Sequence, residues 1–366
     1  MEPVIKYINK DQAKFFSTLR KRVDGYFKES QQSKYGSSRL VWKSIGVFAL
    51  YFVPYTLLLL DFVPIWGMIL LSVFMGIGMA GIGMAIMHDG NHGTFSSKGW
   101  LNRLMGSSII LVGGHKSNWK IQHNVLHHTY TNVFEVDEDI DANGLIRMSP
   151  HAERKKMHRF QHIYAFFLYG LMTMFWYTFK DIKQLTDFHK RGLQHGKKMD
   201  LKSEIFKLTL GKAIYTVYML VIPMLVIDSV PWWGVLIGFS IMHFVCGVTL
   251  GVIFQLAHVV ESTEQPLPDE TGTIENTWAV HQLMTTANFA RKNKVLSWYI
   301  GGLNYQVEHH IFPNISHIHY PEISKIVQAT AKEFNVPYNE YESFWEAFAS
   351  HVRLLKELGA PQPKMA

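Results

Sequence analysis

The stretch that decides the fold runs from residue 65 to residue 92 and reads IWGMILLSVFMGIGMAGIGMAIMHDGNH. Residues 65–87 are apolar or small, and none of them carries a charge. An α-helix rises about 1.5 Å per residue, so about 20 such residues cross the hydrocarbon core of a bilayer. Polar residues begin at His88, and His92 completes an H-x-x-x-H frame. The stretch therefore predicts a transmembrane helix that brings two histidines to one membrane surface.

Three further stretches, residues 41–60, 208–227 and 232–257, have the length and composition of a membrane span. Two turns of similar sequence, DFVPIWG and DSVPWWG, join the four stretches in pairs. Proline suits the first turn of a helix, and tryptophan suits the membrane interface. The whole chain is 48% hydrophobic and 18% charged, which is apolar for a soluble enzyme. We therefore predict an all-α integral membrane protein with four transmembrane helices arranged as two hairpins.

The basic residues indicate how the hairpins are oriented. All 36 Lys and Arg lie outside residues 44–97 and 213–290. Because cytoplasmic loops are enriched in Lys and Arg, we expect both hairpins to enter from and return to the cytoplasm. The net charge of +7 then reflects a basic membrane-proximal face, and no nucleic-acid partner is expected. The predicted single domain, 1–366, comprises a basic cytoplasmic N-terminal segment (1–40), hairpin one (41–87), a cytoplasmic or interfacial region (88–207), hairpin two (208–257) and a cytoplasmic helical cap (258–366).

One stretch argues against four crossings, because residues 161–179 are nearly long enough to span a bilayer. A lone fifth crossing would put His88 and His92 on the opposite side from His309 and His310, and one metal cluster could not form. We therefore expect residues 161–179 to lie in or near the interface, flanked by basic residues. A sixth crossing at residues 104–114 would also restore parity, but that stretch is too short.

Eight histidines follow a pattern typical of a metal site. Three groups occur in the frames HDGNH (88–92), HNVLHH (123–128) and QVEHH (306–310), and one further histidine ends the fourth span. Histidines four apart share a helix face, whereas adjacent ones diverge by about 100°. Eight imidazoles exceed the three or four of a mononuclear zinc site, so two metal ions are the economical interpretation. The predicted ligands are His88, His92, His123, His127, His128, His258, His309 and His310.

These frames, in this order, resemble those of the membrane-bound fatty acyl desaturases. The likeness covers roughly residues 40–327 and includes Trp119, Trp278, Gln282 and the run NYQVEHHIFP at 304–313. The resemblance implies a di-iron centre held by the eight histidines, which activates dioxygen to remove two hydrogens from adjacent methylenes of a lipid acyl chain. Gln306 stands where many members have a histidine. This glutamine resembles the front-end group, whose members insert a double bond between an existing one and the carboxyl end.

Other residues near the frames carry weaker expectations. Gln306, Asp89, Asn124 and Glu308 are either ligands or groups that support ligands, and Trp119 is expected to line the substrate path. The small residues Gly76, Gly78, Gly81 and Gly83 are further candidates for an acyl tunnel. The G-x-G-x-x-G match at residues 76–81 lies inside an apolar span without a βαβ context, so we interpret it as close helix packing. His115, His281, His317 and His319 are expected to be structural. The alternating Asp137, Asp139 and Asp141 suggest a solvated acidic turn, because the calcium-loop pattern is incomplete.

The resemblance also implies a partner and leaves alternatives open. The chain has no His-Pro-Gly-Gly haem motif, so electrons are expected from a separate ferredoxin or cytochrome b5, docking on the basic cytoplasmic face. Acyl-chain hydroxylation, epoxidation or acetylenation could start from the same centre. A histidine-rich metal transporter is the alternative from another class. It should place ionisable residues along a path through the membrane, whereas the predicted spans contain few besides His243.

Overall fold

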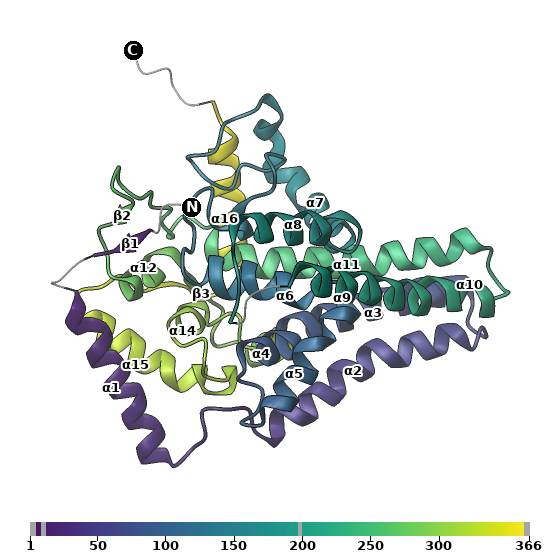
Figure 1. The fold of residues 1–366 in the computed structure, drawn as a ribbon, viewed down its shortest axis with the longest axis horizontal. Helices are drawn as coiled ribbons and strands as arrows, with labels where there is room; N and C mark the ends of the chain where they lie inside the picture. Colours follow the sequence, from purple (N-terminus) through teal and green to yellow (C-terminus); the bar gives the residue numbers. More distant parts are fainter. Residues whose placement is uncertain (1–4, 9–11, 197–199, 362–366) are drawn as a thin grey trace. The chain divides into compact units, whose positions relative to one another are not determined.

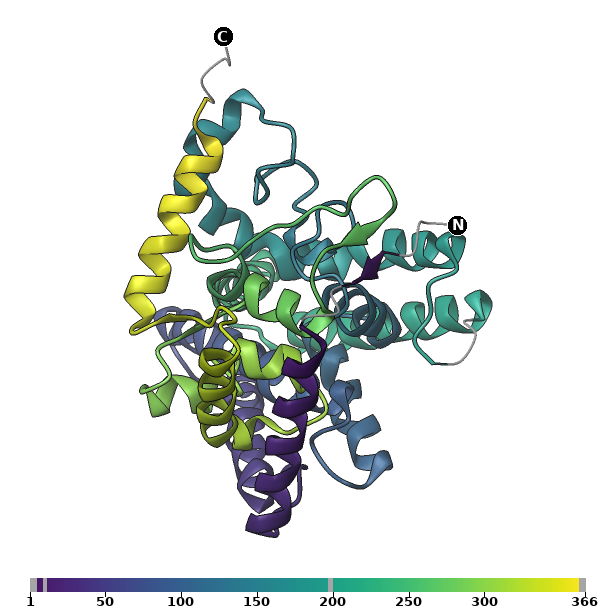
Figure 2. The same cartoon turned by 90° about the vertical axis from the view of Figure 1, so that its left-hand side faces the viewer.

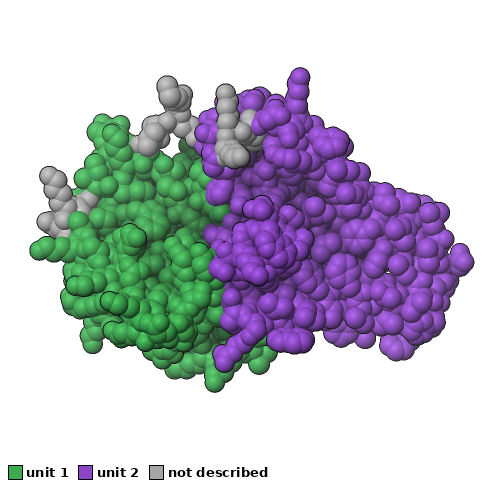
Figure 3. Space-filling view, turned by 60° about the horizontal axis from the view of Figure 1, so that its bottom comes forward, with its two compact units in different colours: residues 1–35, 122–165, 253–366 green, residues 36–121, 166–252 purple. Residues whose placement is uncertain are grey.

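The computed structural model describes residues 5–8, 12–196 and 200–361, most of them helical. They divide into two compact units, coloured separately in Figure 3. Unit 1 comprises residues 1–35, 122–165 and 253–366, and unit 2 comprises residues 36–121 and 166–252. The predicted single-domain organisation stays a prediction. The all-α class is confirmed.

The long helices of unit 2 include four that are long and apolar enough to cross a membrane, among the residues described. They are Ser38–Leu59, Ile65–His92, Leu201–Val226 and Trp232–His258. The predicted spans are thus confirmed by length and composition. The first is α2, and the last is α11, whose residues from Ile253 belong to unit 1. The second consists of α3 (Ile65–Gly81), η1 (Ile82–Met87) and α4 (His88–His92). The third consists of α9 (Leu201–Thr216), η7 (Val217–Val221) and α10 (Ile222–Val226).

Close helix packing in unit 2 depends on glycine. Figure 1 shows α2 and α3 as neighbouring antiparallel helices. A Cβ atom on Gly78 would lie 2.8 Å from backbone atoms of α2, and one on Gly76 would lie 2.6 Å from the carbonyl oxygen of Met242 in α11. Backbone therefore occupies the space beside both glycines. The close helix packing expected for this glycine motif is therefore confirmed at Gly76 and Gly78. The expectation that these two glycines line an acyl tunnel is wrong.

The two turns of similar sequence contact each other in unit 2. The Asp61 carboxylate accepts hydrogen bonds from the backbone N–H groups of Asp228 (2.9 Å) and Ser229 (3.0 Å). The repeated turn therefore joins the two hairpins at the end of α3 opposite to the one that leads to the first histidine frame.

Shorter helices complete unit 2. Residues 161–191 form one helix, made of α7 (Gln161–Phe175), η6 (Trp176–Lys180) and α8 (Asp181–Arg191), which begins in unit 1. It is not among the membrane-span candidates of the described chain, and its interfacial position stays a prediction. The stretch 104–114 comprises the end of α5 (Gly99–Ser107) and the 3-10 turn η2 (Ser108–Val112), and α6 (Lys116–Trp119) follows it. None of these three elements is long enough to span a membrane.

Unit 1 is a helical body with its own apolar core. Helix α1 (Ala13–Ser30) buries Phe15, Leu19 and Val23, which lie four residues apart on one face. They pack with Ile323 and Val327 of α15, and Figure 2 shows the two helices side by side. The amphipathic helix predicted from residue 321 is confirmed as α15 (Tyr320–Glu333). The other helices of unit 1 are η3 (Lys120–His127, beginning in unit 2), η4 (Glu138–Ile140), η5 (Lys156–Phe160), α12 (Trp278–Thr285), α13 (Lys294–Tyr299), α14 (Gln306–Ile311), η8 (His317–His319) and α16 (Phe344–Gly359).

Two small parallel sheets in unit 1 were not predicted. Strand β1 (Lys6–Tyr7) pairs with β2 (Thr273–Ile274), and β3 (Ala287–Phe289) pairs with β4 (Asn339–Tyr341). Each strand has only two or three residues, too few to show an alternating pattern.

Candidate metal centre

Three histidines of unit 1 converge through their Nε2 atoms. His127, His258 and His310 each offer a ring nitrogen within 4.8 Å of the other two, and all three residues are buried. None of the three Nε2 atoms has a hydrogen-bond partner. A buried polar atom without a partner costs about 1–3 kcal/mol, so three such atoms at one point need an explanation. Imidazole nitrogens at this spacing fit a metal ion.

The other nitrogen of each ring holds the ring in place. His127 Nδ1 lies 2.9 Å from Asp137 Oδ2, His310 Nδ1 lies 2.8 Å from Gln282 Oε1, and His258 Nδ1 lies 3.4 Å from the carbonyl oxygen of Thr285. Each partner is an acceptor, so it favours the tautomer with hydrogen on Nδ1. The lone pair of Nε2 then points to the shared centre. This arrangement is usual for histidines that bind metals.

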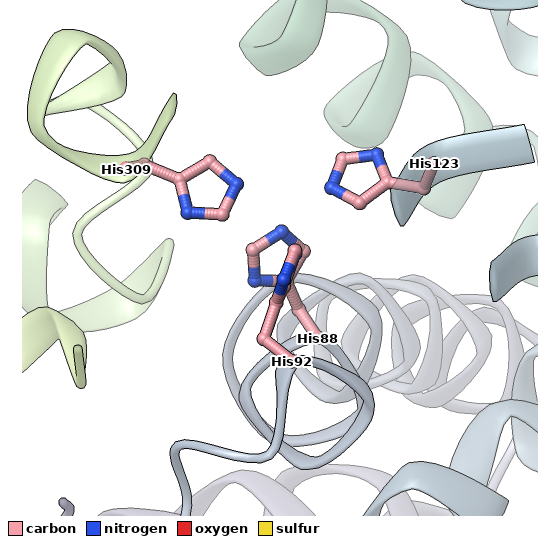
Figure 4. A group of neighbouring side chains, drawn as sticks. All are labelled: His88, His92, His123 and His309. Carbon is pink, nitrogen blue, oxygen red and sulfur yellow. The ribbon is translucent and has the colours of Figure 1, made fainter. Parts of the chain in front are cut away.

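A second group of histidines adjoins the first in unit 1. Ring nitrogens of His128, His309 and His310 also lie within 4.8 Å of one another, and His128 Nε2 is 3.2 Å from His123 Nε2. Figure 4 includes His123 and His309, whose rings stack with centroids 5.9 Å apart. Since His310 belongs to both groups, six histidines form two adjoining sites that fit two ions.

The second histidine frame lies on a π-helix. The backbone N–H of His128 donates to the carbonyl oxygen of His123, five residues earlier, at 3.0 Å, whereas the spacing had predicted an α-helix. Residues five apart share a face of a π-helix, and such segments are frequent at functional sites. His123 therefore faces both His127 and His128, with ring centroids 5.2 and 4.8 Å away. The adjacent His127 and His128 fall in different groups, as their divergence on a helix predicts, whereas the adjacent His309 and His310 share one group.

The first histidine frame lies in unit 2, on α4. His88 and His92 project from consecutive turns, as Figure 4 shows, with ring centroids 4.6 Å apart. Trp119 packs edge-on against both rings, at 5.7 and 5.8 Å. Gly90 allows α4 to approach α5 closely, because a Cβ atom there would lie 2.4 Å from the backbone nitrogen of Gly106. A role of Trp119 in lining the substrate path stays a prediction.

The acidic turn after the second frame is part of the site, so its interpretation as solvated is wrong for Asp137. This residue is 1% exposed and contacts His127 Nδ1 with both carboxylate oxygens. Asp139 lies 3.6 Å from His123 Nδ1 and 3.5 Å from His127 Nδ1. Burial lowers the pKa of His127, but Asp137 and Asp139 outweigh burial and raise it to about 9. The only signal in the sequence was an acidic residue ten positions after a candidate ligand.

Gln306 is a buried polar side chain beside the third frame. It is 1% exposed, and neither atom of its amide group has a hydrogen-bond partner. Gln306 does not orient the following histidines by hydrogen bonds, because His309 Nδ1 contacts Tyr320 Oη (3.2 Å) and His310 Nδ1 contacts Gln282. Whether Gln306 is a ligand or a group that supports the ligands stays a prediction.

Glu308 anchors α14 through polar contacts with side chains of unit 1. Its carboxylate accepts hydrogen bonds from Asn288 Nδ2 (2.8 Å) and Tyr338 Oη (2.9 Å). Asn288 Oδ1 in turn accepts the backbone N–H of Val307. Burial raises the pKa of Glu308 to about 7, against these hydrogen bonds. Glu308 thus supports the helix that carries His309 and His310.

The two remaining candidates for supporting roles lie next to the frames. Asp89 follows His88, and its carboxylate lies 3.9 Å from His88 Nδ1. Its carbonyl oxygen accepts the backbone N–H of Thr94 at 2.9 Å, closing the end of α4. Asn124 is half-buried on η3, and its role stays a prediction.

Histidines expected to be structural have ordinary partners. His281 Nε2 lies 2.9 Å from the carbonyl oxygen of Thr131, and His319 Nε2 lies 2.8 Å from that of Ser33. His115 Nε2 lies 3.5 Å from the Glu204 carboxylate, and His317 is buried. His243, within a candidate span, contacts the hydroxyl groups of Tyr215 (2.9 Å) and Thr173 (3.0 Å). None of these five belongs to a histidine group that could hold a metal, within the described part of the chain.

Comparison with known proteins identifies a family. Residues 64–342 match the model of the fatty acid desaturase family. The sn-1 linoleoyl-lipid 6-desaturase of Synechocystis sp. is 36% identical over 349 residues, 94% of this chain and 95% of that protein. The enzyme of the same name from Arthrospira platensis is 35% identical, covering 94% and 92%. The acyl-lipid (8-3)-desaturase of Physcomitrium patens is 32% identical, covering 97% of this chain and 74% of that protein.

Proposed function

Because the chain belongs to the fatty acid desaturase family, we propose that it introduces a double bond into a lipid-linked acyl chain, between an existing double bond and the carboxyl end. The observation that carries the proposal is the convergence of three buried Nε2 atoms without protein partners, on His127, His258 and His310. Front-end regiochemistry is supported by Gln306 and by the names of the similar enzymes, a 6-desaturase and an (8-3)-desaturase.

We propose that two iron ions occupy the centre. Iron supplies the redox and dioxygen chemistry that amino-acid side chains lack. The two histidine groups of unit 1 support two ions, and His88 and His92 are included because they form the first histidine frame of this family member. Gln306 completes the set directly or through water. The proposed ligands are His88, His92, His123, His127, His128, His258, His309 and His310.

The residues around the histidines have three tasks in this proposal. Asp137, Gln282 and the Thr285 carbonyl keep Nδ1 protonated, so that Nε2 binds metal. Asp137 and Asp139 contribute negative charge beside the ions. Burial of the rings excludes water, which protects a reactive centre from side reactions.

The reaction needs an outside source of electrons. Removing two hydrogens from the acyl chain while reducing one dioxygen to two waters consumes two further electrons and two protons. We propose a separate donor of the ferredoxin or cytochrome b5 class. The distribution of Lys and Arg supports a basic cytoplasmic face for its docking and a cytoplasmic active site.

Expression in a host fed defined fatty acids tests the function. Cells supplied with linoleate should form a product with one additional double bond on the carboxyl side of the existing ones, located by mass spectrometry. His127→Ala is the inactive control, and His319→Ala, which alters a histidine outside both groups, should retain activity. Recovery of hydroxylated or epoxidised acids without new double bonds would overturn the proposal.

A further inference from the structure

A cavity of about 280 Å³ in unit 2 is separate from the histidine frames. It lies between the Gly113–Gly114 turn and the first half of α9, where the third candidate span begins. Ile109, Ile110 and Leu208 form its apolar wall. The rest of the lining consists of three lysines, two serines, three glycines and His115. The cavity therefore combines apolar and cationic walls at one end of a membrane span.

The cationic wall carries charge in excess of its counter-ions. Lys207 Nζ lies 2.7 Å from a Glu204 oxygen, and Lys212 Nζ lies 2.6 Å from an Asp181 oxygen. Lys116 differs, because none of the ion pairs among the described residues includes it. Its Nζ donates to the carbonyl oxygen of Arg103 (2.7 Å) and lies 3.1 Å from Ser107 Oγ.

Two further cations surround Lys116. Burial, followed by the charges of Lys120 and Arg103, lowers the pKa of Lys116 to about 8. Three neighbouring cations repel one another, and an anion bound among them would relieve this repulsion. Ser107 and Ser117 also line the cavity, but their hydroxyl groups already donate to the carbonyl oxygen of Arg103 (2.7 Å) and to a carboxylate oxygen of Glu204 (2.5 Å). Lys116 is therefore the principal donor that the cavity offers to a phosphate oxygen.

The cavity is connected by packing to the first histidine frame of unit 2. Ile109, in its wall, also packs against Met87 and Trp119. Met87 precedes His88, and Trp119 contacts the rings of His88 and His92. A molecule held in the cavity would therefore lie beside the structure that carries these two histidines.

We propose that this cavity binds a phosphate ester on the carrier of the acyl chain, with Lys116 as its principal donor. The inference rests on the proposed function, since it takes the substrate to be an acyl chain on a carrier. A phosphate ester could belong to a glycerophospholipid or to coenzyme A. The apolar wall and the position at the start of a span favour the phospholipid, which presents its phosphate at the membrane surface.

Two substitutions alter the cavity by different means. Lys116→Gln removes the charge and keeps the length of the side chain nearly constant. Gly211→Leu fills the space, because a Cβ atom on Gly211 would meet only Ile110 Cγ1, at 3.9 Å. A leucine also suits a helix better than glycine, so the fold should tolerate it. Lys202→Gln is the matched control, since Lys202 is an exposed lysine of α9 outside the cavity.

Binding to the purified full-length protein in detergent measures the effect without turnover. Fluorescent dilinoleoyl phosphatidylglycerol should bind at least tenfold more tightly than monogalactosyl diacylglycerol with the same chains. We expect Lys116→Gln to weaken phosphatidylglycerol binding about tenfold, as for loss of one charge-assisted hydrogen bond. Gly211→Leu should abolish the preference, and Lys202→Gln should leave it unchanged. Thermal unfolding of each variant verifies that it is folded.

Competition distinguishes the possible sources of the phosphate. Displacement by coenzyme A but not by inorganic phosphate would support a phosphate-ester site that serves acyl-coenzyme A, and displacement by neither would support the phospholipid. Displacement by millimolar inorganic phosphate, equal binding of the galactolipid, or unchanged binding in both cavity variants would overturn the inference. Wild-type protein that binds phosphatidylglycerol selectively but forms no unsaturated product would refute the proposed function alone.

Discussion

Replacing Asp137 tests the metal centre most directly. Its two oxygens lie 2.9 and 3.1 Å from His127 Nδ1, and together with Asp139 it raises the pKa of His127 from 6.5 to about 9 despite burial. One pKa unit corresponds to about 1.4 kcal/mol, so the folded protein favours the protonated ring by roughly 3 kcal/mol. At pH 7 a metal ion must therefore displace a proton from His127.

The Asp137→Asn variant keeps the size of the side chain and removes its charge. Burial should then leave His127 largely neutral at pH 7, although Asp139 retains a weaker effect from 3.5 Å. Metal binding should release roughly one proton fewer than in the wild type. In the metal-free wild type, the raised pKa contributes stability that is fully present below pH 6.5 and is lost as the pH rises through 9. In the Asp137→Asn variant, most of this pH dependence of the free energy of unfolding should be lost.

Calorimetric titration of the metal-free protein with Co²⁺ at pH 7, in two buffers of different ionisation enthalpy, counts the released protons. We also expect desaturation to fall by about 10- to 100-fold, the usual cost of losing a group that orients a ligand. Asp141→Asn, an exposed residue of the same turn, is the control and should behave as the wild type. Equal proton release by Asp137→Asn and the wild type would refute the reasoning.

Three further predictions follow from other contacts. Gln282→Ala removes the nearer of two partners of His310 Nδ1, at 2.8 Å, and leaves Thr131 Oγ1 at 3.2 Å. The variant should lower metal content at limiting iron by about 10-fold. Gln282→Glu, which keeps an acceptor, should lose less metal, and equal loss in both variants would contradict the role. Because the pKa of Glu308 is raised to about 7, the protein should become less stable as the pH rises from 4.5 through 7. Glu308→Gln should therefore flatten the pH dependence of the melting temperature. An unchanged slope in this variant would exclude Glu308 as the source of that dependence. The cytoplasmic location of the active site is tested in a variant lacking the native cysteine. There, Ser229→Cys should react with an impermeant maleimide on intact cells, whereas Ser97→Cys should react only after permeabilisation. The reverse pattern would overturn the cytoplasmic location of the active site.

The local parts of this protein were predictable because local composition decides them. Residues 65–87 form a helix of membrane-spanning length, since an uninterrupted apolar segment satisfies its backbone hydrogen bonds only within itself in a bilayer. The histidine frames could be recognised because metal binding limits both residue type and spacing. Spacing alone also predicted that His127 and His128 fall in different groups, but the same argument does not hold for His309 and His310, which share one group.

The chain's amino-acid order, taken by itself, determined the spans and the set of histidines, whereas tertiary structure decided which nitrogen of each ring is available. His310 depends on Gln282, 28 residues away, and His258 on Thr285, 27 residues away. The sequence predicts that Asp137 is solvated, whereas the structure shows it buried against His127. Such hydrogen bonds have no periodicity along the chain, because they form only when separate helices pack together. The glycine motif at residues 76–81 indicated close helix packing, but only the tertiary structure shows that the α11 backbone lies opposite Gly76.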